Sequence, residues 1–416
     1  MIVSTLPILL GSRDNGIHPC GVHDLDDPYP ELSALTRTAP VSRVGDSDFY
    51  LVTGWDAIAE AVARPEDFSS NLTATMVWKE GGKVEEYPIA ELGSPIHVLA
   101  TADDPSHKAH RAMVMPSLVA KRVRALEPFI DVTVERLWSE GLRDGRIDWV
   151  AAVAQRLPMA VVAELLGFPT YDIDDLVRWS FAATVLLDGV VSPAQLEAAA
   201  EAVGELSAYL STAFDEAMDA PGENVMGDLA RLVDQGEIDH GTAVMIGLQL
   251  VAAGAESTVS LLGSAVYLLG RHPDVIEKLR SDRELVPLFI EEALRLESPF
   301  RGHYRHVVTD TELGDVDLPA GSHLYLMWGA ANRDPATFER TEEVDLDPAN
   351  RRSHMAFGKG IHLCVGAALA RLEGRLAVGH LLDHTPRGFT VDTADPQWER
   401  SLLVRRLRSL AVRVDG

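Results

Sequence analysis

A cysteine near the carboxyl terminus carries the clearest chemical signal in the sequence. Cys364 ends a glycine-punctuated loop that begins at Phe357, and an alanine-rich stretch typical of a helix follows it directly. The first turn of a helix offers unpaired backbone N–H groups and the positive end of its dipole, and both favour a thiolate over a thiol. Gly358, Gly360 and Gly366 would let the backbone approach a flat ligand closely. We therefore expect Cys364 to coordinate a large planar metal cofactor, although an isolated cysteine is more often a buried structural residue.

The pattern of residues 357–366, aromatic-Gly-x-Gly-x-His-x-Cys-x-Gly, resembles the heme-ligand loop of the cytochromes P450. In that family the cysteine thiolate donates electron density to iron and promotes O–O cleavage. The resemblance implies that the cofactor is heme b (iron protoporphyrin IX), that Cys364 is the iron ligand, and that Phe357, Gly358 and Gly366 contact the cofactor.

A long apolar stretch in the middle of the sequence predicts a buried helix. Residues 241–270 contain one charged residue, Glu256, and the run exceeds the about 20 apolar residues that a membrane span needs. A charge at the centre of a bilayer is costly, and polar Ser257 stands beside it. We therefore predict a helix of roughly 45 Å that is buried inside the protein, with Asp239 as its N-cap.

Residues 252–258 of this stretch, Ala-Ala-Gly-Ala-Glu-Ser-Thr, resemble the oxygen-activation segment of the same family. The resemblance implies that Gly254 opens a groove for O2, and that Glu256, Ser257 and Thr258 form the catalytic set that relays protons. Ser257 stands where the family has threonine. Its hydroxyl can bond back to the carbonyl of Ala253, but it lacks the methyl group that restricts χ1, and we expect this to affect how tightly proton delivery is coupled to oxidation. The alternative is a polar interruption that only keeps a buried helix in register.

Glu292 and Arg295 are three residues apart and share a helix face. Such a pair is ordinarily a surface pair of little energetic value. Upstream of a heme-thiolate loop it resembles the family's Glu-x-x-Arg pair, and the resemblance implies that it locks the core to the loop before the cysteine. Loss of either buried partner would then be severe.

Cationic side chains suited to the two carboxylates of a heme recur along the chain. By resemblance to the family, the propionate ligands are expected to be His107, Arg111, Arg305 and His354. Arg301 and His303 compete with Arg305 for its role.

Composition narrows the class of protein further. The chain has 416 residues, a net charge of −26 and two cysteines, Cys20 and Cys364. The acidic balance argues against a nucleic-acid binder, and an unpartnered Cys20 is consistent with a reducing cytoplasm. The apolar N-terminal residues 1–10 are too short to span a bilayer and lack a basic signal-peptide region. We expect a cytoplasmic protein with no membrane span, formed of an N-terminal extension (1–24) and one heme domain (25–416).

Two stretches free of acidic residues stand out against this background. The first contains Lys108, Arg111, Lys121, Arg122 and Arg124, and the second contains Arg351, Arg352, Lys359 and Arg371. Both flank segments assigned to the cysteine side of the heme, so a basic face there could steer an acidic electron donor toward the iron. The alternative is chance combined with propionate binding.

The periodicity of the remaining sequence predicts a mainly helical protein with a small β region, the single large fold of the cytochromes P450 with heme between a long distal helix and the cysteine loop. A hairpin is expected over 40–52, helices over 55–63, 150–166, 172–187 and 193–218, and strands near 305–308, 322–327 and 402–414. By analogy with the family, candidate substrate-pocket residues are Met76, Trp78, Phe181, Gln249, Phe300 and Leu402.

The resemblance covers residues 25–410 and implies a bacterial heme-thiolate monooxygenase that inserts one atom of O2 into a small to mid-sized apolar substrate. Electrons would come from NAD(P)H through a ferredoxin reductase and ferredoxin. Segments 69–75 and 300–306 also resemble an actinobacterial, including mycobacterial, subgroup of unsettled substrates. Two alternatives stay open: the same scaffold used for oxidative coupling, desaturation or peroxide-driven oxidation, and a heme-binding sensor without turnover.

Overall fold

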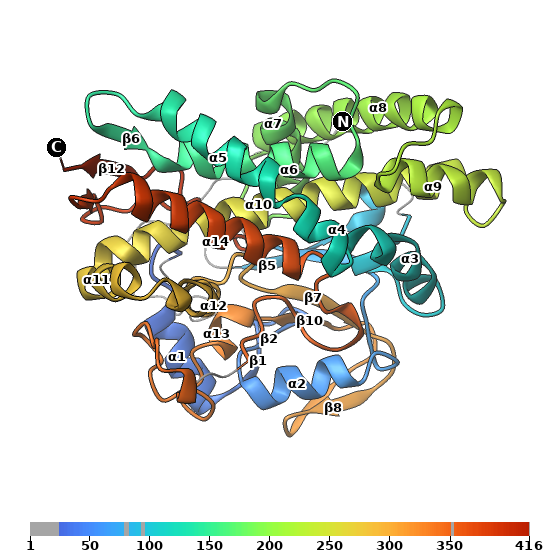
Figure 1. Cartoon of the computed structure of the whole chain (residues 1–416). Coiled ribbons are helices and arrows are strands. Elements are labelled where there is room, and N and C mark those ends of the chain that lie inside the picture. The colour runs from blue at the N-terminus through green and yellow to red at the C-terminus, as the bar shows by residue number, and fades with distance from the viewer. Residues whose placement is uncertain (1–24, 79–82, 93–95, 351–352, 416) are drawn as a thin grey trace.

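The computed structural model describes residues 25–78, 83–92, 96–350 and 353–415. Helices form the larger part of the molecule, and small sheets lie beside them (Figure 1). The helices are α1 (Tyr29–Thr38), α2 (Trp55–Ala63), α3 (Ser106–Val114), α4 (Ala120–Ala125), α5 (Glu127–Gly141), α6 (Arg156–Leu166), α7 (Ile173–Val185), α8 (Pro193–Asp219), α9 (Val225–Asp234), α10 (His240–Arg271), α11 (Pro273–Ser281), α12 (Val286–Leu296), α13 (Trp328–Ala331) and α14 (Ala367–His384). The predicted fold class, mainly helical with a small β region, is confirmed.

The largest sheet has five strands in the order β1-β2-β10-β7-β3, and β2 and β10 are parallel. Its strands are β1 (Val41–Arg43), β2 (Phe49–Val52), β3 (Phe68–Ser69), β7 (His303–Val307) and β10 (His323–Leu326). A three-stranded sheet joins β6 (Arg146–Asp148), β11 (Phe389–Val391) and β12 (Ala411–Val414), and two hairpins pair β4 (Ala74–Trp78) with β5 (Val84–Pro88) and β8 (Thr311–Leu313) with β9 (Val316–Leu318). Strand β7 carries one wall of the site described below.

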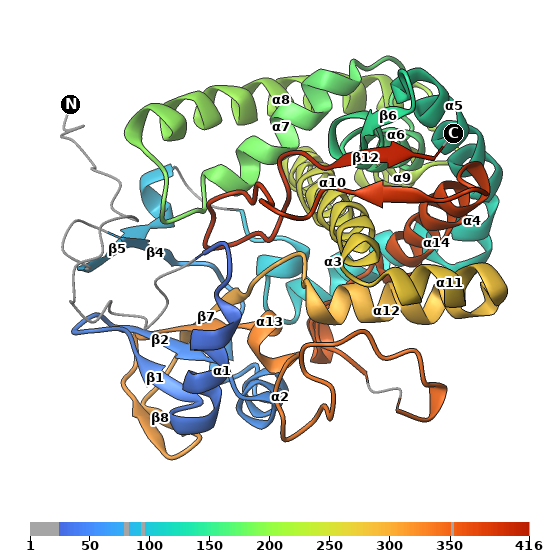
Figure 2. The same ribbon diagram turned by 90° about the vertical axis from the view of Figure 1, so that its left-hand side faces the viewer.

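Helix α10 runs through the middle of the molecule, with helices on several sides of it (Figure 2). Asp239 caps it as predicted, because its carboxylate accepts a hydrogen bond from the Thr242 amide at 2.8 Å. Among the described residues, α10 is the helix that is long and apolar enough to cross a membrane. It packs against α6, α7, α8, α12 and α14 instead, which is the position of a core helix.

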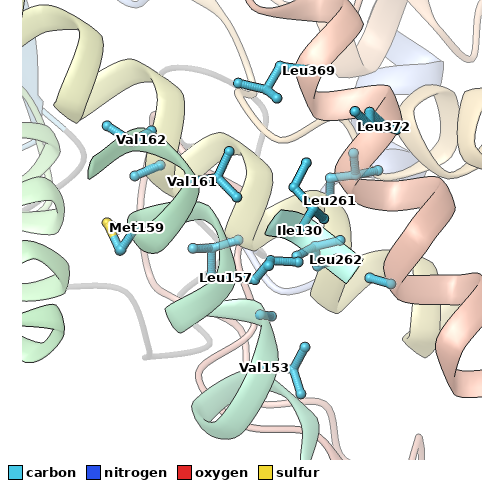
Figure 3. Close-up of a cluster of buried hydrophobic side chains, with 14 of the residues drawn as sticks. Ile130, Val153, Leu157, Met159, Val161, Val162, Leu261, Leu262, Leu369 and Leu372 are labelled. Atoms are coloured by element: carbon cyan, nitrogen blue, oxygen red, sulfur yellow. The ribbon is translucent and has the colours of Figure 1, made fainter. Parts of the chain in front are cut away.

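The main hydrophobic core fills the space between α10 and the helices on either side. Leu157, Val161 and Val162 of α6 lie near Leu261 and Leu262 of α10, and Leu369 and Leu372 of α14 lie on the other side (Figure 3). The Trp149 indole donates a hydrogen bond to the Leu262 carbonyl at 2.9 Å. This packing fixes the separation between α10, which carries Gly254, Ser257 and Thr258, and α14, the helix that follows the cysteine loop.

Most predicted elements match the observed ones. The hairpin over 40–52 and the helix over 55–63 are present as β1–β2 and α2. The predicted helix over 150–166 is present but begins with a π-helical turn, Val150–Ala154, before α6. The long strand predicted over 402–414 is wrong for its first half, since residues 402–407 make only isolated bridges and the strand is confined to β12. There the Arg405 and Arg406 side chains form buried ion pairs with Glu297 and Glu256 instead of alternating between a core and a solvent face.

Candidate active site

A cavity lies between α10 and the cysteine loop, and it encloses about 1530 Å³ including its open mouth. Apolar side chains and backbone from α6, α10 and the loop at 356–366 form most of its wall, while β7 contributes His303 and Arg305 and α3 contributes His107 and Arg111. One side of the cavity therefore carries Cys364, the facing side carries Gly254 and Ser257, and cationic groups gather at one end. The arrangement suits a flat ligand with charged groups on one edge.

Cys364 lies where the sequence predicts, directly before α14. The Cys364 amide donates to the Phe357 carbonyl at 2.9 Å, which closes the loop, and Gly358 and Gly360 have positive φ values of 69° and 74°. The Cys364 sulfur is open to the cavity, whereas protein encloses its other sides. The loop therefore presents sulfur to a ligand in the cavity.

The helix terminus favours the Cys364 thiolate as predicted, but burial opposes it more strongly. Burial raises the pKa of the Cys364 thiol above its ordinary value, and the backbone N–H groups of Gly366 and Ala367, with the nearby Arg111 and Arg371, lower it by less. The helix terminus acts in the predicted direction, but the cost of placing a charge in an enclosed site is larger.

Four cationic or imidazole groups meet at one end of the cavity. Arg305 is buried, and its guanidinium donates to the carbonyl of the preceding residue, Tyr304, at 2.7 Å. Burial lowers the pKa of Arg305 to about 10. The ring of His107 lies 4.1 Å from that of His362, and Arg111 donates to the Leu363 carbonyl at 2.8 Å.

Neither ring nitrogen of His362 has a hydrogen-bond partner among the described residues, and burial lowers the pKa of this imidazole to about 3. Buried polar groups are normally paired. An anionic ligand at this end would supply the acceptors that Arg305 and His362 lack. The residues present therefore fit the carboxylates of a heme, and His362 is a site residue that the sequence assignment missed although the loop motif contains it.

His354 is not among the residues that line the cavity, and its assignment as a propionate ligand stays a prediction. Its side chain is 3% exposed, and its Nε2 lies 3.3 Å from the Glu291 carboxylate. Arg371 also pairs with Glu291, at 2.7 Å, and lies over the ring of Phe357. His354, Glu291 and Arg371 thus fasten the cysteine loop to α12. Burial alone would raise the pKa of Glu291, but the hydrogen bonds and electrostatic attraction of Arg371 and His354 outweigh it and lower the pKa to about 2.

The competition between Arg301, His303 and Arg305 is resolved by their positions. Arg301 is buried away from the cavity, where it donates to the carbonyls of Val404 at 3.1 Å and Leu25 at 2.6 Å. His303 lines the cavity, but its Nδ1 accepts a hydrogen bond from the Trp328 indole at 2.7 Å. Arg305 is the guanidinium that faces the cavity.

On the opposite wall, α10 brings Gly254, Ser257 and Thr258 to the cavity. A Cβ added at Gly254 would meet Val162 at 3.2 Å, so glycine leaves room where α6 approaches. The Ser257 hydroxyl donates to the Ala253 carbonyl at 2.8 Å, as predicted, and the Thr258 hydroxyl donates to the Gly254 carbonyl at 3.0 Å.

Glu256 lies behind this wall and is not among the residues that line the cavity. Its carboxylate accepts a hydrogen bond from Arg406 at 3.0 Å, and the Thr184 hydroxyl of α7 donates to its other oxygen. Burial raises the pKa of Glu256 above its ordinary value, and the Arg406 guanidinium offsets only part of this effect. The sequence did not predict either partner, since they come from distant segments.

Glu292 and Arg295 form a bidentate buried pair on α12, with N–O distances of 2.8 and 2.7 Å. Arg295 also donates to the carbonyls of Asn332, Arg340 and Glu343 at 2.9–3.2 Å. Glu292 accepts the Asp345 amide at 2.9 Å. The pair thus holds the segment that leads to the cysteine loop, which is the arrangement expected from the resemblance.

Of the six predicted pocket residues, Gln249 and Phe300 line this cavity and Met76, Trp78, Phe181 and Leu402 do not. Met76 and Leu402 belong to a neighbouring buried cluster, against which Trp78 packs, and Phe181 lies beneath the Arg406 guanidinium. These four residues lie outside the recognised sequence motifs, and the sequence therefore could not show whether each of them lines the cavity or packs in the core.

One acidic residue of the cavity was not predicted at all. Glu373 of α14 is 2% exposed, lines the cavity, and has one carboxylate oxygen without a hydrogen-bond partner within the described part of the chain. Burial raises the pKa of the Glu373 carboxyl well above the ordinary value, which favours its protonated form. Glu373 shares the buried face of α14 with Leu369 and Leu372. An acidic residue at such a position in the apolar pattern could have been recognised from the sequence.

The cysteine loop before α14, the long α10 opposite it and the cationic end of the cavity define a heme-thiolate enzyme, and the chain belongs to the cytochrome P450 family of monooxygenases. The family model described as "Cytochrome P450" matches residues 227–397. Cytochrome P450 144 of Mycobacterium tuberculosis is 51% identical over 395 residues, which cover 95% of this chain and 90% of the relative.

Other relatives agree with this membership. The 6-deoxyerythronolide B hydroxylase of Saccharopolyspora erythraea is 33% identical and covers 94% of this chain, with 96% of its own length matched. The solved structure of cytochrome P450 CREJ in complex with (4-ethylphenyl) dihydrogen phosphate has a TM-score of 0.86 at 27% identity. The match covers 96% of this chain and 100% of the CREJ chain. The predicted similarity to a mycobacterial subgroup is confirmed, and the family implies a heme-thiolate cofactor.

Proposed function

We propose that this cytochrome P450 inserts one oxygen atom of O2 into a small to mid-sized apolar organic substrate in the cytoplasm. The observation that carries the proposal is the cavity itself, in which Cys364 lies opposite Gly254 and Ser257 and the walls between them are apolar. At one end of the cavity, Arg305 and His362 have hydrogen-bonding groups that an anionic ligand could satisfy. Heme bound there supplies the reductive activation of O2. The remaining requirements fall on the residues of this chain.

Each group has a role that follows from its position. Cys364 would ligate the iron, Phe357, Gly358 and Gly366 would lie against the ring, and His107, Arg111, Arg305 and His362 would hold the propionates. The hydroxyls of Ser257 and Thr258 line the cavity and would accept and pass protons there, with Glu256 as the buried acid behind them. Gln249 and Phe300 would contact the substrate.

The relatives support the reaction class, and the cavity wall supports the class of substrate. Two relatives, at 33% and 31% identity, are named 6-deoxyerythronolide B hydroxylase and vitamin D(3) 25-hydroxylase, and both names describe a hydroxylation. Apolar side chains such as Leu99, Leu165 and Leu250 line this cavity as well. Burial of apolar substrate surface against these side chains would provide binding energy.

The thiolate assignment is tested by the spectrum of the reduced protein under carbon monoxide. The wild-type protein should show a strongly red-shifted Soret band, and Cys364→Ser should lose it while Cys20→Ser keeps it. A Cys364→Ser variant that is spectrally identical to wild type would overturn the assignment. Titration of the ferric protein with a library of apolar compounds, scored by displacement of the axial water, would then identify the substrate class.

We further propose that ferredoxin, reduced by NAD(P)H through a ferredoxin reductase, docks on the cysteine side of the molecule. Lys108, Lys121, Arg124 and Lys359 are exposed there, together with the apolar side chains of Val119, Ile361 and Leu363. Arg122 is less available than the sequence suggested, since it pairs with Asp228 at 2.8 Å. Arg351 and Arg352 lie outside the described residues. An acidic partner would be attracted to this face and repelled by the remaining surface of a chain with net charge −26.

The docking proposal is tested by charge reversal. Lys121→Glu combined with Arg124→Glu should slow reduction by a ferredoxin by about tenfold at low salt and weaken its salt dependence. Lys278→Glu combined with Arg387→Glu makes the same change of charge on α11 and in the turn before β11, and should have little effect. Equal reduction rates for both double variants would refute docking on this face.

A further inference from the structure

Two carboxylates on α5 face two histidines on α14, away from the cavity. Asp131 and Glu135 are one turn apart on α5, and His380 and His384 are one turn apart on α14. The two helices pack against each other. Ligand atoms of Glu135, His380 and His384 all lie within 4.8 Å of one another. His380 is thirteen residues beyond the start of α14 at Ala367, or roughly 20 Å along the helix axis, so this cluster is separate from Cys364.

The hydrogen bonds of His384 determine which nitrogen can act as a ligand. Its Nδ1 lies 2.9 Å from the carbonyl oxygen of His380. A carbonyl only accepts, so Nδ1 carries the proton. The Nε2 of His384 lies 2.7 Å from the Glu135 carboxylate, and in the neutral imidazole this atom holds a lone pair. Two acceptors in contact require a cation between them, either a proton or a metal ion.

His380 is oriented in the complementary way. Its Nε2 lies 2.8 Å from the Asp131 carboxylate, which accepts the proton of that nitrogen. Its Nδ1 is buried, has no hydrogen-bond partner in the described part of the chain, and lies 3.6 Å from the same Glu135 oxygen. A histidine whose far nitrogen is held by a carboxylate and whose near nitrogen is bare is the arrangement that metal sites use to fix the tautomer.

We propose that Glu135, His380 and His384 bind a divalent transition-metal ion, with zinc as the physiologically abundant choice. The ligands would be the Nδ1 of His380, the Nε2 of His384 and a Glu135 oxygen, with water completing a tetrahedron. Asp131 and the His380 carbonyl orient the imidazoles from outside. Bonds of about 2.0 Å at tetrahedral angles place ligand atoms roughly 3.3 Å apart. The Glu135 side chain, which is 50% exposed, can move outward by the small distance that this requires.

Binding would clamp α5 to the carboxyl-terminal end of α14, the helix that follows the cysteine loop. A metal ion that binds the folded chain but not the unfolded chain stabilises the folded state by mass action. The site therefore links metal supply to the stability of the heme-bearing half of the molecule and leaves the chemistry of the cavity untouched.

The test uses heme-loaded, tag-free protein, stripped with a chelator and then titrated with ZnCl2 by calorimetry, with bound metal counted by mass spectrometry. We expect one zinc ion per chain, and a rise in the melting temperature on the order of 2–5 °C at 100-fold excess over Kd. Glu135→Gln and His384→Ala should weaken binding at least tenfold. Asp131→Asn, which touches no metal, should weaken it about 10- to 100-fold because it releases the His380 tautomer.

Two matched controls separate this site from general surface binding. Glu140→Gln changes a carboxylate on the same helix that pairs with Arg136, and His240→Ala removes an imidazole that pairs with Asp215 at 2.9 Å. Both should bind zinc like the wild type. Equal stoichiometry and affinity in the wild type and in a His380→Ala, His384→Ala double variant would overturn the proposal, as would a wild type that takes up no zinc. The first result would place the zinc elsewhere, and the second would leave a proton between His384 and Glu135.

Discussion

Ser257 uses its single hydroxyl proton within its own helix, where it donates to the Ala253 carbonyl at 2.8 Å. In this rotamer the oxygen can accept a hydrogen bond from a group in the cavity but has no hydrogen to donate to it. Serine lacks the methyl group that restricts χ1 in threonine, so the hydroxyl can leave this rotamer more freely. Coupling of proton delivery to oxidation should depend on how often it does.

We expect Ser257→Thr to lower the ratio of oxidised product to hydrogen peroxide by about twofold, because the added methyl group restricts how often the hydroxyl leaves the rotamer in which it donates to Ala253. The measurement is product and peroxide per NAD(P)H consumed with a reconstituted donor. Thr212→Ser, a methyl change at an exposed helical threonine that also bonds back to its helix at 3.1 Å, is the control. An unchanged ratio for Ser257→Thr would show that this position does not control coupling. Labelled O2 in the same assay separates oxygen insertion from coupling, desaturation or peroxide-driven chemistry.

At the residue scale, the sequence predicted groups whose partners are near in the chain and missed those whose partners are distant. The bond from Ser257 to Ala253 follows from helical spacing alone. The pairing of Glu256 with Arg406 joins residues 150 positions apart, and no local pattern contains it. His354 and His362 are both histidines of the same loop, and only the path of the backbone shows that the first turns to Glu291 and the second to the cavity.

Among the elements, α12 is fastened to the chain before the cysteine loop by the Glu292–Arg295 pair. Arg295 is 2% exposed and Glu292 is 12% exposed. A buried pair of this kind leaves an uncompensated charge when one partner is removed.

Glu292→Gln should therefore lower the free energy of unfolding by on the order of 3–5 kcal/mol and reduce heme retention. Urea unfolding and the heme content of the purified protein are the measurements. Asp274→Asn breaks the exposed pair with Lys278 on α11, which spans 2.9 Å, and should cost less than about 1 kcal/mol. Similar losses in the two variants would contradict the role assigned to Glu292.

Helix boundaries could be predicted closely where apolar periodicity is clear, as for α2, and where a capping residue such as Asp239 marks the start, as for α10. The π-helical turn before α6 could not, because Val150–Ala154 have the composition of an ordinary helix. The strand predicted from residue 402 failed because buried arginines there serve ion pairs, which a β pattern cannot reveal. Strand pairing across the five-stranded sheet joins residues far apart in sequence and was likewise beyond prediction.

For the molecule as a whole, buried histidines link stability to pH. Burial lowers the pKa of His323 on β10 to about 4, and the nearby His306 contributes. In the unfolded chain a histidine titrates near 6.5. Between these pH values the unfolded chain binds a proton at His323 that the folded chain does not bind. The contribution of His323 to the free energy of unfolding is therefore fully present above about pH 6.5 and is lost as the pH drops toward 4.

We expect the free energy of unfolding of the wild type to decrease between pH 7 and pH 5, with His323 contributing on the order of 2 kcal/mol to that decrease. His323→Gln should reduce the slope, as measured by urea unfolding at pH 7, 6 and 5. His240→Gln, at a position whose side chain is 44% exposed, is the control. If the free energy of unfolding of His323→Gln changed with pH as steeply as that of the wild type, groups other than His323 would be responsible for the loss of stability at acid pH.

The division into an extension (1–24) and a heme domain (25–416) stays a prediction. The extension, with Cys20, lies outside the described residues. The structure does show the start of the described chain fastened to two later segments, since Arg301 before β7 donates to the Leu25 carbonyl and Arg405 near the C-terminus donates to the Asp26 carbonyl.

The Gln249 amide oxygen of α10 accepts a hydrogen bond from the Ala100 amide at 3.0 Å, beside Leu99, whose φ is 42°. One such bond contributes only about 1 kcal/mol, so thermal fluctuation breaks it often. Ala100 and Gln249 both line the cavity, so breaking this bond loosens one part of its wall without disturbing the core. A bulky compound that displaces residues 99–101 should therefore pay only about 1 kcal/mol for the lost bond, and the protein should tolerate some variation in substrate size there.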